Sequence, residues 1–265
     1  MGKFFHGILL ALYTLVVIAA ILWLGRMGYS YYRLPVEGAA RVDHPLYDLL
    51  RPNGFIGHGL GIIGTLLILI GLFTYMARKR MKVFARWGLL KYWLEVHIFL
   101  CSLGYVMVTF HTSFKFGGLV SIGYWSLTIV FLSGMVGRFL YIQIPRTREG
   151  RELSMKEVVE LKTQLDIELN QKYGIRVADT KGKKLTELKR EMISKGITSK
   201  EFRQIRRLLL KEQILEGRIQ RLEKLHNLFK YWHVIHLPFA LIMLIIMVIH
   251  VGVSLYFGYS WIFFK

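Results

Sequence analysis

Long uncharged runs alternate with charged segments along this chain, as in helical membrane proteins. Five runs are long enough, as helices, to cross a hydrocarbon layer of about 30 Å. They cover residues 7–25, 54–77, the stretch between Glu95 and Lys115, 119–137 and 231–257. The pattern predicts an all-α integral membrane bundle of five transmembrane helices.

The basic residues set the expected orientation. A short segment after the second run contains Arg78, Lys79, Arg80, Lys82, Arg86 and Lys91 and has no acid before Glu95. Short loops rich in lysine and arginine stay in the cytoplasm, so this segment is predicted to be cytoplasmic. The N-terminus then lies inside and the C-terminus outside.

A long charged segment separates the fourth and fifth runs. Residues 138–232 hold 23 basic and 13 acidic side chains, a net charge of +10. Ser154-x-x-Glu157 and Thr198-x-x-Glu201 match capping boxes that precede apolar residues at helical spacing. We expect transmembrane helices 1–4 in residues 1–144, a helical cytoplasmic insert in 145–230 and the fifth helix with an outer C-terminus in 231–265. The insert is either a solvated charged arm or a docking platform for another subunit.

Composition narrows the class further. The chain is 54% hydrophobic with a mean hydropathy of +0.39, too apolar for an ordinary soluble domain of 265 residues. Its formal charge of +19 lies beside apolar runs, which points to anionic membrane lipid, and no nucleic-acid motif accompanies it. The only cysteine, Cys101, excludes a disulfide within the chain and a CxxCH haem attachment site. Any haem must be bound non-covalently.

Four histidines form two equally spaced pairs. His97 and His111 lie fourteen residues apart in the third run, and His236 and His250 repeat the spacing in the fifth. On a helix, fourteen residues rise about 21 Å and return to within about 40° of the same face. Neutral imidazole is a common axial ligand of haem iron. The spacing predicts two b-type haems, one above the other, each held by a histidine from both helices.

This pattern resembles the dihaem b-type membrane cytochromes. The group includes cytochrome b of quinol-oxidising complexes, the cytochrome subunits that anchor respiratory dehydrogenases, and the ferric reductase and NADPH oxidase membrane domain. The last of these carries its ligands on the third and fifth helices, as predicted here. The resemblance covers the helices and the histidine spacing, not the insert, and no flavin or nicotinamide segment follows His250.

The third and fifth helices are both expected to run outward, so histidines at the same depth in the membrane should pair across them. His97 and His236 would bind an inner haem and His111 and His250 an outer one, with His233 the competitor of His236. Basic side chains that could contact propionates are Arg86, Lys91, Arg138, Lys230 and His233 inside, and Lys115 outside. Each could instead be a basic residue that extends to the membrane interface. His58, near the outer haem by depth, is a candidate quinone-site residue, a hydrogen-bond partner of a haem propionate, or a polar contact between packed helices.

The first hypothesis is a membrane subunit that moves electrons between a quinone pool and a partner redox subunit, such as a multihaem cytochrome c, an iron–sulfur protein or a flavoprotein. The alternatives are a transmembrane ferric or oxygen reductase supplied by a separate flavoprotein, and a haem-free membrane scaffold or metal-ion carrier that uses the histidines as ligands. The charge distribution fits a bacterial inner membrane, with an organelle membrane as the alternative.

Overall fold

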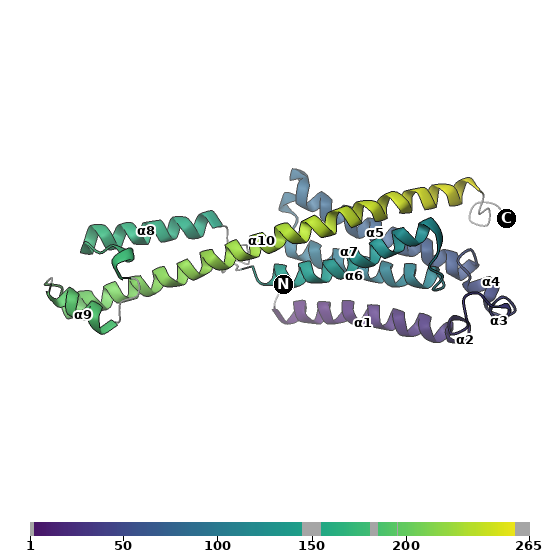
Figure 1. Ribbon diagram of the computed structural model, residues 1–265, viewed down its shortest axis with the longest axis horizontal. Helices are drawn as coiled ribbons and strands as arrows, with labels where there is room; N and C mark the ends of the chain where they lie inside the picture. Colours follow the sequence, from purple (N-terminus) through teal and green to yellow (C-terminus); the bar gives the residue numbers. More distant parts are fainter. Residues whose placement is uncertain (1–2, 145–154, 181–184, 195, 258–265) are drawn as a thin grey trace. The chain divides into compact units, whose positions relative to one another are not determined.

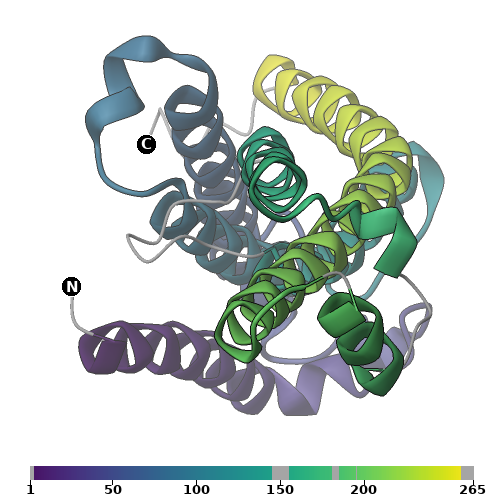
Figure 2. The ribbon, with the colours of Figure 1, turned by 90° about the vertical axis from the view of Figure 1, so that its left-hand side faces the viewer.

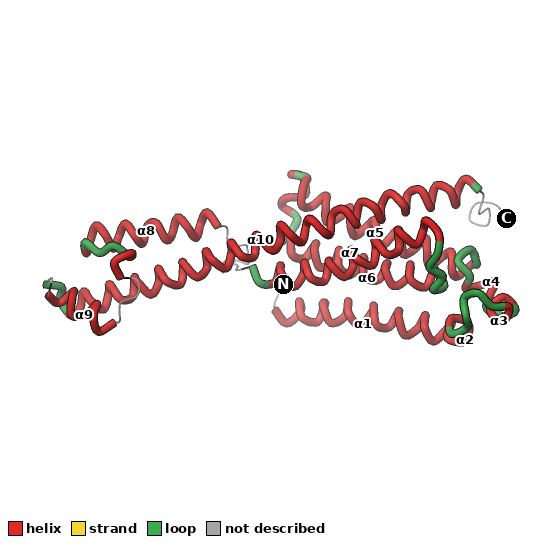
Figure 3. Tube along the Cα trace, viewed as in Figure 1, coloured by secondary structure: helices red, strands yellow, loops and turns green. Residues whose placement is uncertain are grey.

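The structure is a computed structural model that describes residues 3–144, 155–180, 185–194 and 196–257. These residues form helices joined by loops and turns, without a strand (Figure 3). They divide into two compact units. Unit 1 comprises residues 1–136 and 233–265, and unit 2 comprises residues 137–232. Two helices, α7 and α10, contribute residues to both units.

Unit 1 is a helical bundle. Its long helices are α1 (Lys3–Met27), α5 (Phe55–Arg80), α6 (Leu90–His111), most of α7 (Gly118–Ile142) and the last part of α10 (Ser199–Tyr256). Figures 1 and 2 show these helices running alongside one another. A 3-10 helix, Lys82–Arg86, lies between α5 and α6. The sequence prediction of an all-helical protein with long apolar helices is confirmed.

Three one-turn helices lie between α1 and α5: α2 (Tyr29–Tyr32), α3 (Ala39–Val42) and α4 (Tyr47–Leu50). We call residues 28–54, which contain them, the connecting segment. It packs against the turn after α6, where Ser113 and Phe114 have positive φ angles of 48° and 60°. Ser113 donates its hydroxyl to the Leu50 carbonyl oxygen at 2.5 Å, which ties the turn to the connecting segment.

Two apolar clusters hold unit 1 together. Leu24 of α1 packs with Leu60 of α5 and with Val106 and Phe110 of α6. A second cluster joins α5, α7 and α10 through Ile68, Leu127 and Met243. Between them, α5 and α6 approach closely, because a Cβ on Gly104 would lie 2.7 Å from the Gly64 carbonyl oxygen. Small residues permit this backbone approach between apolar helices.

The outer surface of unit 1 is apolar. Five described helices are long and apolar enough to cross a membrane. In the most apolar stretch of α1, only 6% of the residues are buried. Large exposed side chains on that helix include Leu15, Leu22 and Trp23. A contiguous apolar surface of this extent is costly in water and marks contact with another apolar medium. The chain therefore has the surface of an integral membrane protein.

Unit 2 is built from α8 (Met155–Tyr173), a 3-10 helix (Val177–Thr180), α9 (Leu185–Ser194) and the first part of α10. Leu169, Met192 and Ile205 form an apolar core among these helices. The predicted capping box at the start of α10 is present: Thr198 donates its backbone N–H to Glu201, and the Glu201 N–H is donated to the Thr198 hydroxyl. Ser154 lies outside the described residues, as does the predicted C-terminal segment 258–265.

Candidate functional site

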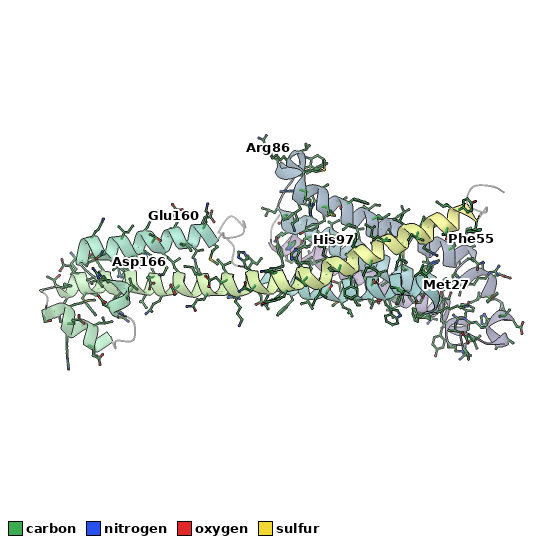
Figure 4. The ribbon with its side chains drawn as sticks, turned by 45° about the horizontal axis from the view of Figure 1, so that its top comes forward. Met27, Phe55, Arg86, His97, Glu160 and Asp166 are labelled. Carbon is green, nitrogen blue, oxygen red and sulfur yellow. The ribbon has the colours of Figure 1, made fainter. Side chains whose placement is uncertain are left out.

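Each predicted pair of histidines lies on a single continuous helix. His97 and His111 are on α6, and His236 and His250 are on α10, which passes through Pro238 without ending. All four side chains are half-buried. His97, labelled in Figure 4, lies against α5, where its Nδ1 meets the Gly71 carbonyl oxygen. The helical geometry on which the fourteen-residue spacing depends is thus present at both pairs.

His111 and His250 face each other at one end of the bundle. Their ring centroids are 6.3 Å apart, with an angle of 55° between the ring planes. With metal–nitrogen bonds of about 2.0–2.1 Å and ring nitrogens about 1.1 Å from the ring centre, two imidazoles on opposite sides of one metal have centroids about 6.2–6.4 Å apart. The two rings are therefore spaced as a pair of axial ligands would be.

The hydrogen bonds of the α6 histidines fix which ring nitrogen carries the proton. His111 Nδ1 lies 2.8 Å from the Gly57 carbonyl oxygen, and His97 Nδ1 lies 3.0 Å from the Gly71 carbonyl oxygen. A carbonyl oxygen only accepts, so each Nδ1 donates, and the neutral ring keeps a lone pair on Nε2. Metal-binding histidines are oriented in the same way, with the second ring nitrogen donating to a carbonyl or carboxylate.

His236 has a comparable partner on α7. Its Nδ1 lies 2.8 Å from Ser133 Oγ, and this hydroxyl is also 3.1 Å from the Val130 carbonyl oxygen. When the hydroxyl proton is donated to that carbonyl, Oγ accepts from His236 Nδ1, as at the α6 histidines. His97 is close enough to His236 for the two to interact electrostatically. His233, the competitor, has an exposed side chain.

A glycine leaves room for one of these imidazoles. A Cβ on Gly61 would lie 2.8 Å from His111 Nδ1 and 2.9 Å from its Cγ, so only glycine allows the observed ring position. On α7, a Cβ on Gly134 would lie 3.9 Å from His236 Cε1, an ordinary van der Waals contact, so this position does not need glycine. Two glycines of α5 thus have different roles: Gly64 permits the close approach of α6, and Gly61 leaves room for the His111 ring.

A cavity of about 640 Å³ opens beside the His111–His250 pair. It is lined by both of these histidines, by His58 of α5 and by residues of the connecting segment. The His58 ring centroid is 6.4 Å from that of His111. Three imidazoles thus meet at this end of the bundle, and we call this space the outer cavity, after the side of the membrane predicted for it.

The predicted propionate contacts are placed very differently. Lys115 lines the outer cavity together with His111 and His250. Lys91 lies over the Tyr92 ring, with Nζ 4.9 Å from its centroid. Arg86 is exposed, and Figure 4 shows it directed away from the helices, so the structure does not bring it to His97. Arg138 and Lys230 belong to unit 2 and are not placed relative to the histidines.

Sequence reasoning missed two features of unit 1. Glu95, only 5% exposed, lies at the start of α6 with Oε1 3.4 Å from His6 Nε2 on α1. The available signal was an acid at the edge of an apolar run, with a histidine near the start of the first run. Arg41 of α3 is also buried and lines the outer cavity. No sequence pattern distinguished it from the other arginines of its segment.

A bis-histidine haem and a metal ion held by protein alone would need different sets of ligands. The described residues contain no group of three or more His, Cys, Asp or Glu side chains arranged to hold a metal ion. A haem iron needs only two protein ligands, and the spacing, the tautomers and the adjoining cavity meet that need. Comparisons with profiles of known protein families, with curated sequences and with solved structures found no match.

Proposed function

We propose that the chain is a dihaem cytochrome b, the electron-transferring membrane subunit of a respiratory oxidoreductase. The observation that carries the proposal is the His111–His250 pair, whose ring centroids are 6.3 Å apart on helices that each repeat the histidine fourteen residues away. In this proposal His97 and His236 hold an inner haem b, and His111 and His250 an outer one. Bound haem supplies one-electron transfer, and the residues hold and tune it.

The hydrogen bonds favour His250 over His58 as the partner of His111. The Nδ1 of His111 is turned toward Gly57 of α5, and Nε2 lies on a different edge of the ring. The lone pair of Nε2 is thus directed away from α5, the helix that carries His58. The carbonyls of Gly57 and Gly71 and the hydroxyl of Ser133 raise the basicity of the three rings that donate to them.

The membrane topology is part of the same proposal. Five spans place the N-terminus and the basic insert in the cytoplasm of a bacterial cell and the C-terminus outside its inner membrane. This places His97 and His236 near the cytoplasm. Unit 2, with its basic surface, would then be available to a cytoplasmic partner, while a multihaem cytochrome c, an iron–sulfur protein or a flavoprotein completes the electron path.

A quinone is the proposed mobile electron carrier, and His58 its proton acceptor. The imidazole lies beside His111 in a cavity large enough for a ring. A group that exchanges protons near neutral pH is needed where quinol is oxidised. His58→Leu should slow haem reduction by a quinol strongly and leave reduction by dithionite unchanged. If the quinol kinetics are unaltered, His58 is a structural residue.

The haem proposal is tested on the purified full-length protein. We expect two non-covalent haems per chain, extractable with acid acetone, with the low-spin signals of bis-histidine iron in electron paramagnetic resonance. His111→Ala or His250→Ala should remove the outer haem, and His97→Ala should remove the inner one. A wild-type protein without haem would refute the proposal and favour a haem-free scaffold.

A further inference from the structure

Arg41 is a buried cation beside the outer cavity. It lies on α3 in the connecting segment, its side chain is 4% exposed, and it lines the cavity together with His58, His111 and His250. Burial of a guanidinium is costly unless the charge is paired and its N–H groups are hydrogen-bonded. The partners of Arg41 are therefore informative about what belongs in the cavity.

The described residues of the protein satisfy only part of the hydrogen-bonding capacity of the Arg41 guanidinium. Nη2 donates to the Ser113 carbonyl oxygen at 2.5 Å, and the charge lies over the Tyr31 ring, 4.5 Å from its centroid. Nη1 is buried and has no hydrogen-bond partner among the described residues. Within the described part of the chain, no carboxylate forms an ion pair with Arg41. One side of the fork is thus held by the protein, and the other lacks an acceptor.

The other charges around the cavity are mostly positive. Arg51 and Lys115 line it with Arg41, against the single acid Glu37. Arg51 pairs through Nη2 with the exposed Asp48 at 3.1 Å, but its buried Nε has no acceptor among the described residues. The cavity therefore combines an excess of positive charge with unused N–H donors on two arginines.

We propose that Arg41 binds a carboxylate group of a ligand in the outer cavity, supported by the charges of Arg51 and Lys115. A carboxylate offers an acceptor to the unused Nη1 and neutralises the buried charge, and arginine is suited to this because its planar fork matches carboxylate geometry. The carboxylate has two possible sources. It is a propionate of the outer haem, which rests on the function proposed above, or it belongs to a small organic acid from the outer medium.

The first arm of the test compares haem b with its dimethyl ester, in which both carboxylates are masked. Full-length protein produced without haem is titrated with each, and binding is followed in the Soret band. We expect the wild type to bind the free acid at the outer site roughly 10- to 100-fold more tightly, the range of a charge-assisted hydrogen bond. Arg41→Gln should abolish the preference and Arg41→Lys should keep part of it.

The matched control is Arg33→Gln. Arg33 belongs to the same segment but is exposed, with its guanidinium 5.8 Å from the Tyr29 ring centroid, and does not line the cavity. This variant should retain the wild-type preference for the free acid. Because the readout is a ratio of two affinities in one protein, a general loss of stability in Arg41→Gln would not imitate the expected result.

The second arm tests the other source. Purified wild type, Arg33→Gln and Arg41→Gln are heated with succinate or with chloride at equal ionic strength. A soluble carboxylate ligand should raise the melting temperature of the first two proteins in succinate only. A wild type that shows neither the ester discrimination nor the succinate effect would overturn the inference, whether or not the variants fold. A wild type that binds no haem would instead refute the proposed function and leave the second arm to decide.

Discussion

The substitution Gly61→Ala should weaken the outer haem site without replacing a ligand. An alanine Cβ at this position would lie 2.8 Å from His111 Nδ1 and 2.9 Å from its Cγ. Comfortable contacts between such atoms begin at about 3.5 Å, so the imidazole must move by about 0.6 Å or more. Because Cγ is next to the side chain's first carbon, rotation of the ring alone cannot relieve the contact.

The cost follows from what the displaced ring loses. A shift of about 0.6 Å lengthens the 2.8 Å bond from His111 Nδ1 to the Gly57 carbonyl oxygen to as much as about 3.4 Å, which weakens it. Its full loss would cost about 0.5–1.5 kcal/mol, and the overpacking costs about 1–3 kcal/mol. Alanine returns about 1 kcal/mol through its higher helix propensity. Helix propensity acts equally on the free and the haem-bound protein, so the penalty for returning the ring to its ligand position, about 2 kcal/mol, sets the change: roughly 30-fold weaker binding of the outer haem.

The assay is a haem titration of Gly61→Ala and of Gly59→Ala, followed by redox difference spectra. Gly59 is the matched control, because a Cβ at this position on the same helix meets nothing within 4 Å. The control should bind both haems as the wild type does, while Gly61→Ala keeps only the inner one at low haem concentration. Equal affinities in the two variants would refute the reasoning.

Three further predictions concern single side chains. His236→Ala should remove the inner haem and His233→Ala should leave its spectrum unchanged, because His233 is exposed; the reverse result in difference spectra would contradict the pairing. Burial raises the pKa of Tyr32 to about 12, whereas the phenol of the unfolded chain ionises near 10, so the folded state loses stability as the pH rises from 10 to 12. The titration of Tyr32, taken as the difference in absorbance at 295 nm between wild type and Tyr32→Phe, should have its midpoint near pH 12. The hydrogen bond to Glu216 raises the pKa of Lys162 above its usual value, so its stabilisation of unit 2 is complete below the usual lysine pKa and is lost above the raised one. Circular dichroism melts between about pH 8 and 12 should therefore converge for wild type and Lys162→Gln at the alkaline end, and parallel curves would count against this.

Much of the helical fold could be predicted from the sequence, because uncharged runs of bilayer length leave little alternative to helices. The ends of the helices were less predictable. The last helix was expected to begin near residue 231, whereas α10 begins at Ser199. Apolar residues continue at the 3.6-residue helical period through the charged segment of α10, where Leu215, Leu222 and Leu225 are buried. Before Pro238, Gly217 is the one glycine or proline in this helix. A change in hydropathy was therefore a poor sign of a helix end.

The candidate site could likewise be predicted only in part, namely where it depends on spacing within one helix. Spacing along one helix could indicate that His97 and His111 share a face, since 3.6 residues per turn fixes this geometry. It could not indicate that Gly57 and Gly71 supply the acceptors for their Nδ1 protons, because this depends on how α5 packs against α6. The pair formed by His6 and Glu95 was missed for the same reason, as it joins residues 89 positions apart.

Arg41 shows why the outer end could not be understood from charge counts. Residues 26–53 contain four arginines and three acids, a nearly neutral composition that predicts a solvated loop. Folding instead separates these charges. The Arg41 guanidinium is buried and donates to the carbonyl oxygen of Ser113, which lies 72 residues further along the chain, while Asp48 remains exposed. Arg41, Arg51 and Lys115 then line the same cavity as His111 and His250. Among the predicted inner contacts, Arg86 is directed away from the helices, so the outer pair is the better place to test how this chain holds an anionic ligand.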